Sequence, residues 1–192
     1  MGDKPELFLL HTCPFSWKVK SLLQHLGIEY DEVQVNPLKT KKQLSFTNGW
    51  NKVPVWRETD GEVLVDSTPM MKEIDSRYNN GGLWMVGDSE RRDKWIEWVD
   101  EHFKRATIPI LYGGLVSALK TTIRVSKLEK FGFISKRLYA WAGFPIMWGI
   151  IAKKRIKKDG RKPKQLWHDL LDDWCDEIGD KEFFGGEAPS LV

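Results

Sequence analysis

The sequence predicts an α/β domain followed by an all-helical domain. Strand-like and helix-like patterns alternate over the first 80 residues, and only helical spacing is found beyond residue 88. A glycine-rich break, Gly81-Gly82 followed by Gly87, separates the two regions. The 192 residues are enough for two small domains with cores of their own. We therefore expect domains at residues 1–80 and 88–192.

The first region begins with a strand, a helix and a second strand. Residues 7–10 are consecutive apolar residues and indicate a buried strand. Apolar residues at helical spacing follow up to Gly27, a residue that suits the end of a helix. Residues 30–35 alternate between polar and apolar side chains and indicate the second strand.

Two further strands and a helix complete the predicted order β-α-β-β-β-α. Residues 53–56 and 63–65 are short β-favouring runs, and the turn signal Asp60-Gly61 between them predicts a hairpin. Ser67 is then expected to cap a helix whose first turn contains a proline.

The second region predicts amphipathic helices. Apolar residues recur at i, i+3, i+4 and i+7 within residues 95–103 and again within 166–178, where Gly179 ends the pattern. Cys175 is expected to be a core thiol of that last helix. Residues 138–152 carry no charge and have basic residues on both sides. We favour a buried core helix there over a membrane-surface segment with snorkelling basic ends.

Charge is distributed unevenly along the chain. Residues 119–165 contain fourteen Lys/Arg but only two acids, Glu129 and Asp159, so this segment carries a net +12 and the remainder −9. Such a segment suits either a solvated face or peripheral contact with an anionic membrane. No aromatic-and-basic recognition module accompanies it, which disfavours nucleic acid as a partner.

The cysteine count and the apolar stretches restrict the class of protein. Cys13 and Cys175 are the only cysteines, which excludes a disulfide framework and the usual C-x-x-C metal ligands, so no metal site is expected. No stretch reaches the roughly 18 apolar residues of a membrane span, and the first residues do not resemble a signal peptide. We expect a cytoplasmic protein, with peripheral membrane attachment as the open alternative.

The segment Cys13-Pro14-Phe15-Ser16 is the strongest chemical signal. It joins a buried strand to an amphipathic helix, so the thiol is placed at a helix N-terminus, where unpaired amides and the helix dipole favour thiolate over thiol. Pro14 suits the first helical turn. Ser16 occupies the place of the resolving cysteine in a dithiol enzyme, so a mixed disulfide on Cys13 would have to be released by an outside thiol. The alternative is a buried structural cysteine.

Two other segments are candidate binding elements. Val53-Pro54 places a proline at the start of a strand, where a cis bond would turn the backbone of Val53 toward a ligand. Asp66-Ser67 combines a carboxylate, a hydroxyl and helix N-terminal amides, which together could hold a group carrying both an amine and a carboxylate. A simple helix cap is the alternative for the second segment.

Taken together, these segments resemble the thioredoxin-like, glutathione-binding domain of glutathione transferases over residues 6–78. Residues 31–37, 52–55 and 95–100 extend the resemblance, which is greatest to the family of membrane-associated prostaglandin E synthase type 2. The resemblance implies an N-terminal thioredoxin-like domain and a helical transferase-type domain, which would be cut short at residue 192.

The resemblance also implies roles for individual residues. Cys13 would be the reactive thiol and, with Pro14 and Phe15, would line the site of glutathione or another low-molecular-weight thiol. Val53 would pair its backbone with the cysteinyl part of the tripeptide, and Pro54 would be the cis-proline that shapes this contact. The γ-glutamyl end would lie against Asp66 and Ser67.

Two departures from the family pattern bear on activity. Ser16 replaces the usual second cysteine, as in dehydroascorbate reductases and intracellular chloride channel proteins, and Leu10 replaces a tyrosine. Both disfavour prostaglandin H to E isomerisation and are compatible with glutathione binding. We therefore expect a glutathione-dependent transferase or thiol reductase acting on a small electrophilic or oxidised substrate, with homodimers as the family habit. The isomerase, a non-catalytic membrane-surface protein and a monothiol iron–sulfur carrier are the alternatives.

Overall fold

The computed structural model describes residues 3–129 and 132–192, apart from the side chains of residues 135, 136, 139 and 140. The chain divides into two compact units. Unit 1 consists of Met1–Trp84, Leu128–Ser135 and Leu191, and unit 2 of Met85–Lys127, Lys136–Ser190 and Val192. The short segment Leu128–Ser135, which the sequence assigns to the helical region, therefore packs with the N-terminal unit.

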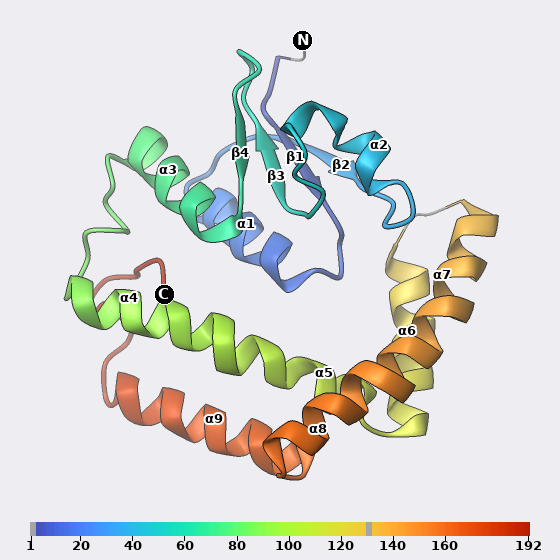
Figure 1. Ribbon diagram of the computed structural model, residues 1–192. Helices are drawn as coiled ribbons and strands as arrows, with labels where there is room; N and C mark the ends of the chain where they lie inside the picture. The colour runs from blue at the N-terminus through green and yellow to red at the C-terminus, as the bar shows by residue number, and fades with distance from the viewer. Residues whose placement is uncertain (1–2, 130–131) are drawn as a thin grey trace. The chain divides into compact units, whose positions relative to one another are not determined.

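Unit 1 is built on a four-stranded mixed sheet with helices on both faces (Figure 1). Its elements in chain order are β1 (Glu6–Leu9), α1 (Pro14–His25), β2 (Asp31–Gln34), α2 (Thr40–Gln43), the 3₁₀ helix η1 (Ser45–Thr47), β3 (Val55–Arg57), β4 (Val63–Val65) and α3 (Ser67–Asn79). The predicted order is confirmed, with α2 and η1 as additions. They were missed because α2 is a single turn without a buried residue, so no apolar period marks it.

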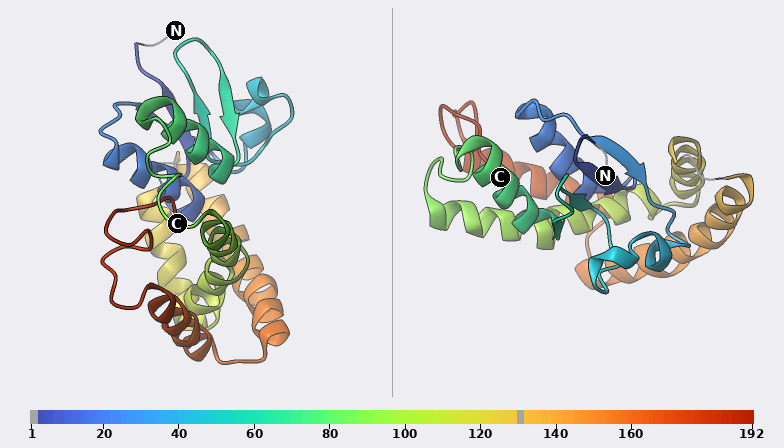
Figure 2. Two further views of the ribbon diagram at one scale, coloured as in Figure 1. Left: turned by 90° about the vertical axis from the view of Figure 1, so that its left-hand side faces the viewer. Right: turned by 90° about the horizontal axis from the view of Figure 1, so that it is seen from above.

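The sheet has the strand order β2-β1-β3-β4, in which only the β1–β2 pair is parallel. Alternate residues of β1 face two separate apolar clusters. Leu7 and Leu9 join Trp56 beneath α1 and α3, whereas Phe8 packs on the other face with Val55 and residues of the α2–η1 segment. Figure 2 shows α1 and α3 on one side of the strands and α2 on the other. Because both faces are covered, the last three residues of β1, Leu7 to Leu9, are all apolar.

The hairpin and the helix after it differ in how well they follow the prediction. β3 and β4 pair antiparallel around the Asp60-Gly61 turn, as predicted, and Gly61 has a φ of 92°, which glycine adopts without steric cost. Ser67 is not the cap of α3. The N-cap residue is Asp66, and Ser67 is the first helical residue, because the extended strand ends one residue earlier than the Ser-Thr-Pro pattern suggests.

The described residues of unit 2 form helices, followed by a C-terminal loop with an isolated bridge between Phe183 and Gly186. Its elements are α4 (Ser89–Trp98), the π-helical segment η2 (Val99–Phe103), α5 (Lys104–Tyr112), α6 (Leu115–Leu128), α7 (Phe133–Pro145), the π-helical segment η3 (Ile146–Ala152), α8 (Lys153–Asp159) and α9 (Pro163–Ile178). Leu128, the last residue of α6, and residues 133–135, the first three of α7, belong to unit 1. α4, η2 and α5 run on as one helix (Figure 1).

An aromatic cluster joins α4 to α9 and the C-terminal loop. Trp95 lies 4.7 Å from Trp98, 5.6 Å from Trp174 and 6.0 Å from Phe184, measured between ring centroids. Trp174 and Phe184 stack at 5.3 Å with an interplanar angle of 17°. Offset and edge-on ring pairs of this kind add to the burial of apolar area. The predicted apolar periods of residues 95–103 and 166–178 thus form one core.

Two expectations for unit 2 are wrong. Cys175 is exposed and is not a core thiol. It lies nine residues after the buried Leu166, which at about 100° per residue places it on the opposite side of α9. Residues 138–152 are not a buried core helix either, since Trp141 is 80% and Ile150 61% exposed. Composition gives the apolar character of a segment but not whether another element covers it.

No single helix in the described residues is long and apolar enough to cross a membrane. By length and composition alone, Ser89–Tyr112 together with Leu115–Leu128 would pass such a test, but the two are bent by 104°.

Arg91 connects three parts of unit 2. Its guanidinium donates to the Glu177 carboxylate, to the Glu177 carbonyl oxygen at 2.8 Å and to the Phe184 carbonyl oxygen at 3.0 Å, and it lies 4.2 Å from the centroid of the Phe184 ring. The hydrogen bond from Arg91 lowers the pKa of Glu177 from its ordinary 4.5. Burial acts in the opposite direction and raises the pKa, while the positive charge of Arg91 lowers it further. The ionised pair therefore stabilises unit 2 above pH 4.5, and this stabilisation is lost as the pH falls through the lowered pKa.

We expect Arg91→Met to lower the free energy of unfolding by about 2–3 kcal/mol at neutral pH, because hydrogen bonds to charged groups are lost while the apolar stem is kept. The difference from wild type should shrink as the pH falls from neutral through the lowered pKa of Glu177, because the protonated carboxyl no longer forms the ion pair with Arg91. Denaturant unfolding across this range measures it. Arg161→Met, at an exposed pair with Asp159 and Asp169, is the control and should cost less than about 1 kcal/mol. A pH-independent Arg91→Met difference would contradict the role of the ion pair.

Candidate active site

The candidate residues gather at one end of the sheet in unit 1. Leu9 at the end of β1 pairs with Gln34 at the end of the parallel β2. Phe8 pairs with Val55 at the start of β3, and Val55 pairs with Val65 at the end of β4. The loops that contain Cys13, Pro54 and Asp66 therefore lie at the same end of the strands.

Cys13 is the N-cap residue of α1, as the sequence predicts. Its backbone is extended, with φ −84° and ψ 121°, and its side chain makes no capping hydrogen bond. The residue is partly accessible, Pro14 is exposed at the first helical position and Phe15 is half-buried. Since the thiol is not used as a cap and solvent reaches it, it is free to react at the positive end of the helix.

Ser16 has a different environment from Cys13. It is fully buried beside Val19, one turn further along α1, and its Oγ has no hydrogen-bond partner among the described residues. The place where a dithiol enzyme carries its second cysteine is thus both a serine and closed to solvent. This arrangement fits a single reactive thiol.

The second and third segments have the backbone features expected of binding loops. The Val53–Pro54 peptide bond is cis, Pro54 is buried and Val53 is half-buried. Asp66 has a φ of 66°, which is uncommon for a residue other than glycine, and such strained residues concentrate at functional sites. Its carboxylate is exposed and makes no capping bond, while Ser67 beside it is buried.

A side-chain hydrogen bond joins the first turn of α3 to α1. Lys18 Nζ donates to Thr68 Oγ1 at 3.1 Å. This bond brings a cation to the helix N-terminus that follows Asp66, where unpaired amides already favour an anionic group. The structure therefore brings all seven predicted residues to one end of unit 1. No hydrogen bond between described residues joins Cys13 directly to Val53-Pro54 or to Asp66-Ser67.

Glu129 is a site residue that the sequence analysis did not identify. Its carboxylate is 1% exposed and accepts hydrogen bonds from Thr12 N at 2.9 Å and Thr12 Oγ1 at 2.6 Å. It also accepts from His11 N at 3.3 Å and Gln34 Nε2 at 2.6 Å. These donors stand immediately before Cys13 and at the end of β2. The one available signal was that Glu129 is one of only two acids in the strongly basic segment 119–165.

A second carboxylate lies on the outer side of the same turn. Glu32 lies 2.6 Å from Lys20 Nζ and 3.8 Å from His11 Nδ1. Burial raises the pKa of Glu32, but the hydrogen bond and charge of Lys20, followed by the charge of His11, outweigh it and leave the pKa lowered. Glu32 therefore carries its charge at neutral pH and holds the Lys20 ammonium beside the turn.

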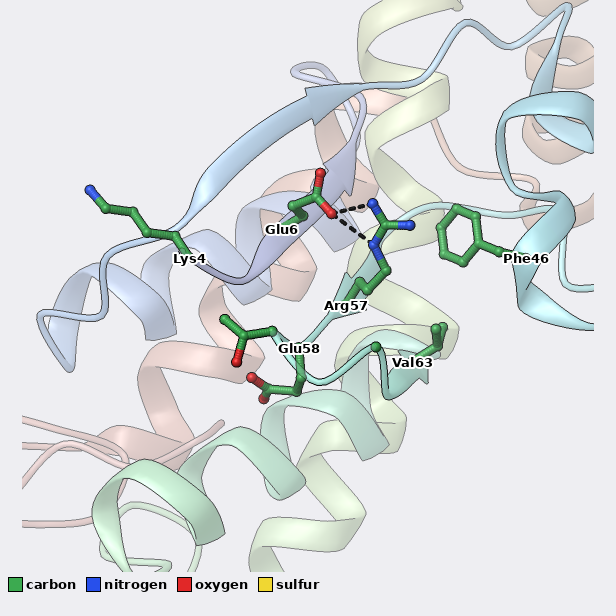
Figure 3. A pocket seen from close by; sticks show the side chains of 8 residues that line it. Lys4, Glu6, Phe46, Arg57, Glu58 and Val63 are labelled. Carbon is green, nitrogen blue, oxygen red and sulfur yellow. Dashed lines mark hydrogen bonds and ion pairs between the residues drawn. The ribbon is translucent and has the colours of Figure 1, made fainter. Parts of the chain in front are cut away.

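A pocket of about 500 Å³ in unit 1 lies away from the thiol (Figure 3). Glu6, at the start of β1, and Arg57 line it, so it is at the opposite end of the strand from Cys13. Arg57 donates to Glu6 through Nε at 2.7 Å and lies over the rings of Phe8 and Phe46. Of the other charged groups that line the pocket, Lys4 pairs with Glu29, and Glu58 accepts from Trp56 and Tyr78. Among the described residues no group of three or more His, Cys, Asp or Glu side chains could hold a metal ion.

Comparison with known proteins agrees with the fold of unit 1. Residues 7–82 match the family "Glutathione S-transferase, N-terminal domain". The zebrafish protein named Prostaglandin E synthase 2 is 25% identical over 98% of this chain, and the chain spans 61% of that protein's length. The resemblance seen in the sequence is confirmed at this level.

Solved structures of glutathione transferases share the fold. One from Rhodospirillum rubrum superposes with a TM-score of 0.64 at 16% identity, covering 97% of this chain and 72% of the other. Human glutathione transferase theta-2 in complex with glutathione superposes with a TM-score of 0.62 at 17% identity, covering 97% and 67%. These similarities establish a thioredoxin-like N-terminal domain and a helical C-terminal region.

Proposed function

We propose that this chain is a glutathione-dependent transferase or thiol reductase that uses Cys13 as its nucleophile. The proposal starts from the match of residues 7–82 to the glutathione S-transferase N-terminal domain. The observation that carries it is the position of Cys13: a partly accessible thiol, unused as a cap, at the first turn of α1. A partly accessible thiol in this position can attack a disulfide or an electrophile as the nucleophile.

With an oxidised substrate, the reaction would take two steps. Cys13 Sγ attacks one sulfur of a mixed or low-molecular-weight disulfide; a new S–S bond forms, the old one breaks, and the departing thiolate takes up a proton. A glutathione thiolate then attacks the mixed disulfide on Cys13, which gives a glutathione disulfide and restores the thiolate. The external thiol is needed because Ser16 offers no second sulfur.

The remaining predicted residues would hold the tripeptide. The exposed carboxylate of Asp66 suits the γ-glutamyl amine, and the N-terminus of α3, with Ser67 and the nearby Lys18, suits its carboxylate. The backbone of Val53, next to the cis-proline, would pair with the cysteinyl part. This arrangement would place the glutathione sulfur toward Cys13.

The chain's similarity to prostaglandin E synthase 2 favours isomerase activity as a second candidate, although Leu10 and Ser16 depart from that family. A third candidate is a non-catalytic membrane-surface protein, favoured by the exposed Leu138, Trp141 and Ile150 ahead of the basic helix α8. Binding to anionic vesicles that Cys13→Ser leaves unchanged would favour the third candidate over an enzyme.

Alkylation of Cys13 tests the proposal. Glutathione should slow the modification of Cys13 by iodoacetamide, because the bound tripeptide would cover the thiol. Cys13→Ser provides the correction for the exposed Cys175. Modification of Cys13 at the same rate with and without glutathione would rule out the glutathione-dependent enzyme.

Asp66→Asn extends the same experiment. Loss of the carboxylate removes the partner of the γ-glutamyl amine, so half-protection should need about tenfold more glutathione, equivalent to about 1.4 kcal/mol. Asp60→Asn, which removes a charge from the exposed hairpin turn, should leave protection unchanged. Equal protection in all three proteins would remove Asp66 from the binding site while leaving the role of Cys13 standing.

A further inference from the structure

We propose that Glu129 is a positioning residue for Cys13: its buried carboxylate fixes the His11-Thr12 turn from which the thiol enters α1. The proposal rests on the thiol chemistry proposed for Cys13, but it does not depend on glutathione as the substrate. The hydrogen bonds described for Glu129 come from Thr12, His11 and Gln34, not from Cys13.

Each oxygen of the Glu129 carboxylate accepts two hydrogen bonds. Oε1 accepts from the amide and the hydroxyl of Thr12, and Oε2 accepts from the amide of His11 and the side-chain amide of Gln34. A carboxylate that is 1% exposed would be costly without such donors. Charge-assisted bonds of 2.6–2.9 Å to three of them offset that cost. The Leu10–His11 and His11–Thr12 peptide groups are therefore held by a residue 117 positions from Thr12 in sequence.

The turn is also held from within its own segment. Trp17 Nε1 donates to the His11 carbonyl oxygen at 2.7 Å, and Cys13 N donates to the Leu10 carbonyl oxygen at 3.1 Å. These bonds fix the carbonyl side of the turn, and Glu129 fixes its amide side. Without Glu129, two amides and a hydroxyl would lose their acceptor, and the direction in which Cys13 leaves the turn would no longer be fixed.

The charge of Glu129 and its positioning role act on Cys13 with opposite signs. A nearby negative charge disfavours a thiolate, so removing the charge alone would speed the reactions of Cys13. Loss of position slows them, because a misplacement of about 1 Å can cost on the order of 100-fold in rate. The sign of the change therefore separates the two effects.

The test is the single-turnover reaction of Cys13 with bis(2-hydroxyethyl) disulfide, in the full chain carrying Cys175→Ser. Cys13 Sγ bonds to one sulfur of the reagent, the S–S bond breaks, and the departing 2-mercaptoethanol thiolate takes up a proton. We expect Glu129→Gln to slow this step at least about tenfold and Thr12→Val about threefold. Thr12→Ser, which keeps the hydroxyl, should restore the rate to within about twofold. Asp159→Asn, at the other acid of the basic segment, is the control that leaves it unchanged.

Hydrogen exchange adds a readout of the turn itself. Glu129→Gln should speed exchange of the His11 and Thr12 amides while exchange in the body of α1 is retained. Should Glu129→Gln fail to fold, the Thr12→Val and Thr12→Ser pair decides the matter, since both keep the charge.

The outcomes are distinct. A rate with Glu129→Gln equal to or above that of the parent, or equal rates for Thr12→Val and Thr12→Ser, would overturn positioning. A parent thiol inert toward the disulfide would also overturn it. A parent that reacts with the disulfide but shows neither glutathione protection nor turnover would remove the proposed function alone.

Discussion

Replacing Cys13 with serine is expected to lower glutathione-dependent disulfide reduction by on the order of 1,000-fold or more, while the chain folds as before. A hydroxyl in the same place is almost entirely protonated at neutral pH and cannot form the mixed disulfide. Cys13 makes no side-chain capping bond and is only partly buried, so its replacement should alter the free energy of unfolding by less than about 1 kcal/mol. Steady-state turnover with glutathione and a small disulfide, followed alongside thermal unfolding, measures both quantities.

Cys175→Ser is the matched control, because it removes the other, exposed thiol and should leave turnover unchanged. A Cys13→Ser protein that retains a tenth or more of the parent rate would show that the chemistry proceeds without a protein thiol, for instance through direct attack by bound glutathione. Loss of rate accompanied by loss of cooperative unfolding would instead assign Cys13 a structural role.

Asp75→Ala is expected to destabilise unit 1 by about 3–5 kcal/mol, the largest stability effect that the described contacts predict. Asp75 lies in α3, is fully buried and accepts from Leu83 N at 3.1 Å, Trp84 N at 2.7 Å and Asn79 Nδ2 at 2.8 Å. The truncation would leave these donors unpaired in the interior. Since domains are commonly stable by about 5–15 kcal/mol, much of the protein should unfold well below its normal midpoint.

Asp75→Asn separates charge from shape. Asparagine fills the same volume but offers one acceptor oxygen and adds two donors opposite backbone amides, so we expect a loss of about 2–3 kcal/mol. Asp60→Asn, where an exposed aspartate accepts a single backbone bond from Glu62, should cost less than about 1 kcal/mol. Chemical unfolding of the three variants gives the comparison. Equal costs for the buried and the exposed aspartate would show that the bonds of Asp75 add nothing to stability.

The strands, the first helix and the place of Cys13 could be predicted because each depends on residues close in sequence. β1 is a short apolar run, α1 has an apolar period closed by Gly27, and the thiol stands between them. The hairpin followed from its turn residues. Asp66 and Ser67 were correctly placed at the start of a helix, but the choice of N-cap residue depended on where β4 ends, and periodicity does not fix boundaries that closely.

The contacts of Glu129 and the exposure of residues 138–152 could not be predicted because they depend on tertiary structure. Glu129 appeared in the sequence as one acid in a basic segment, and nothing local showed that it would meet donors more than 90 positions away. An apolar helical segment has the same sequence pattern whether or not another element covers it. The prediction that Cys175 is buried was wrong for a different reason. A helical projection from the buried Leu166 would have placed Cys175 on the exposed side of α9.

The rings of Trp95, Trp98, Trp174 and Phe184 have an optical consequence. Indoles separated by 4.7–6.3 Å are close enough for their excited states to couple and to exchange excitation energy. Unit 2 therefore carries a built-in chromophore whose near-ultraviolet dichroism and emission depend on α4, α9 and the C-terminal loop being assembled. Trp56, buried in the sheet core of unit 1, emits from a separate environment. Near-ultraviolet dichroism can thus follow the assembly of this aromatic cluster in unit 2 without any label.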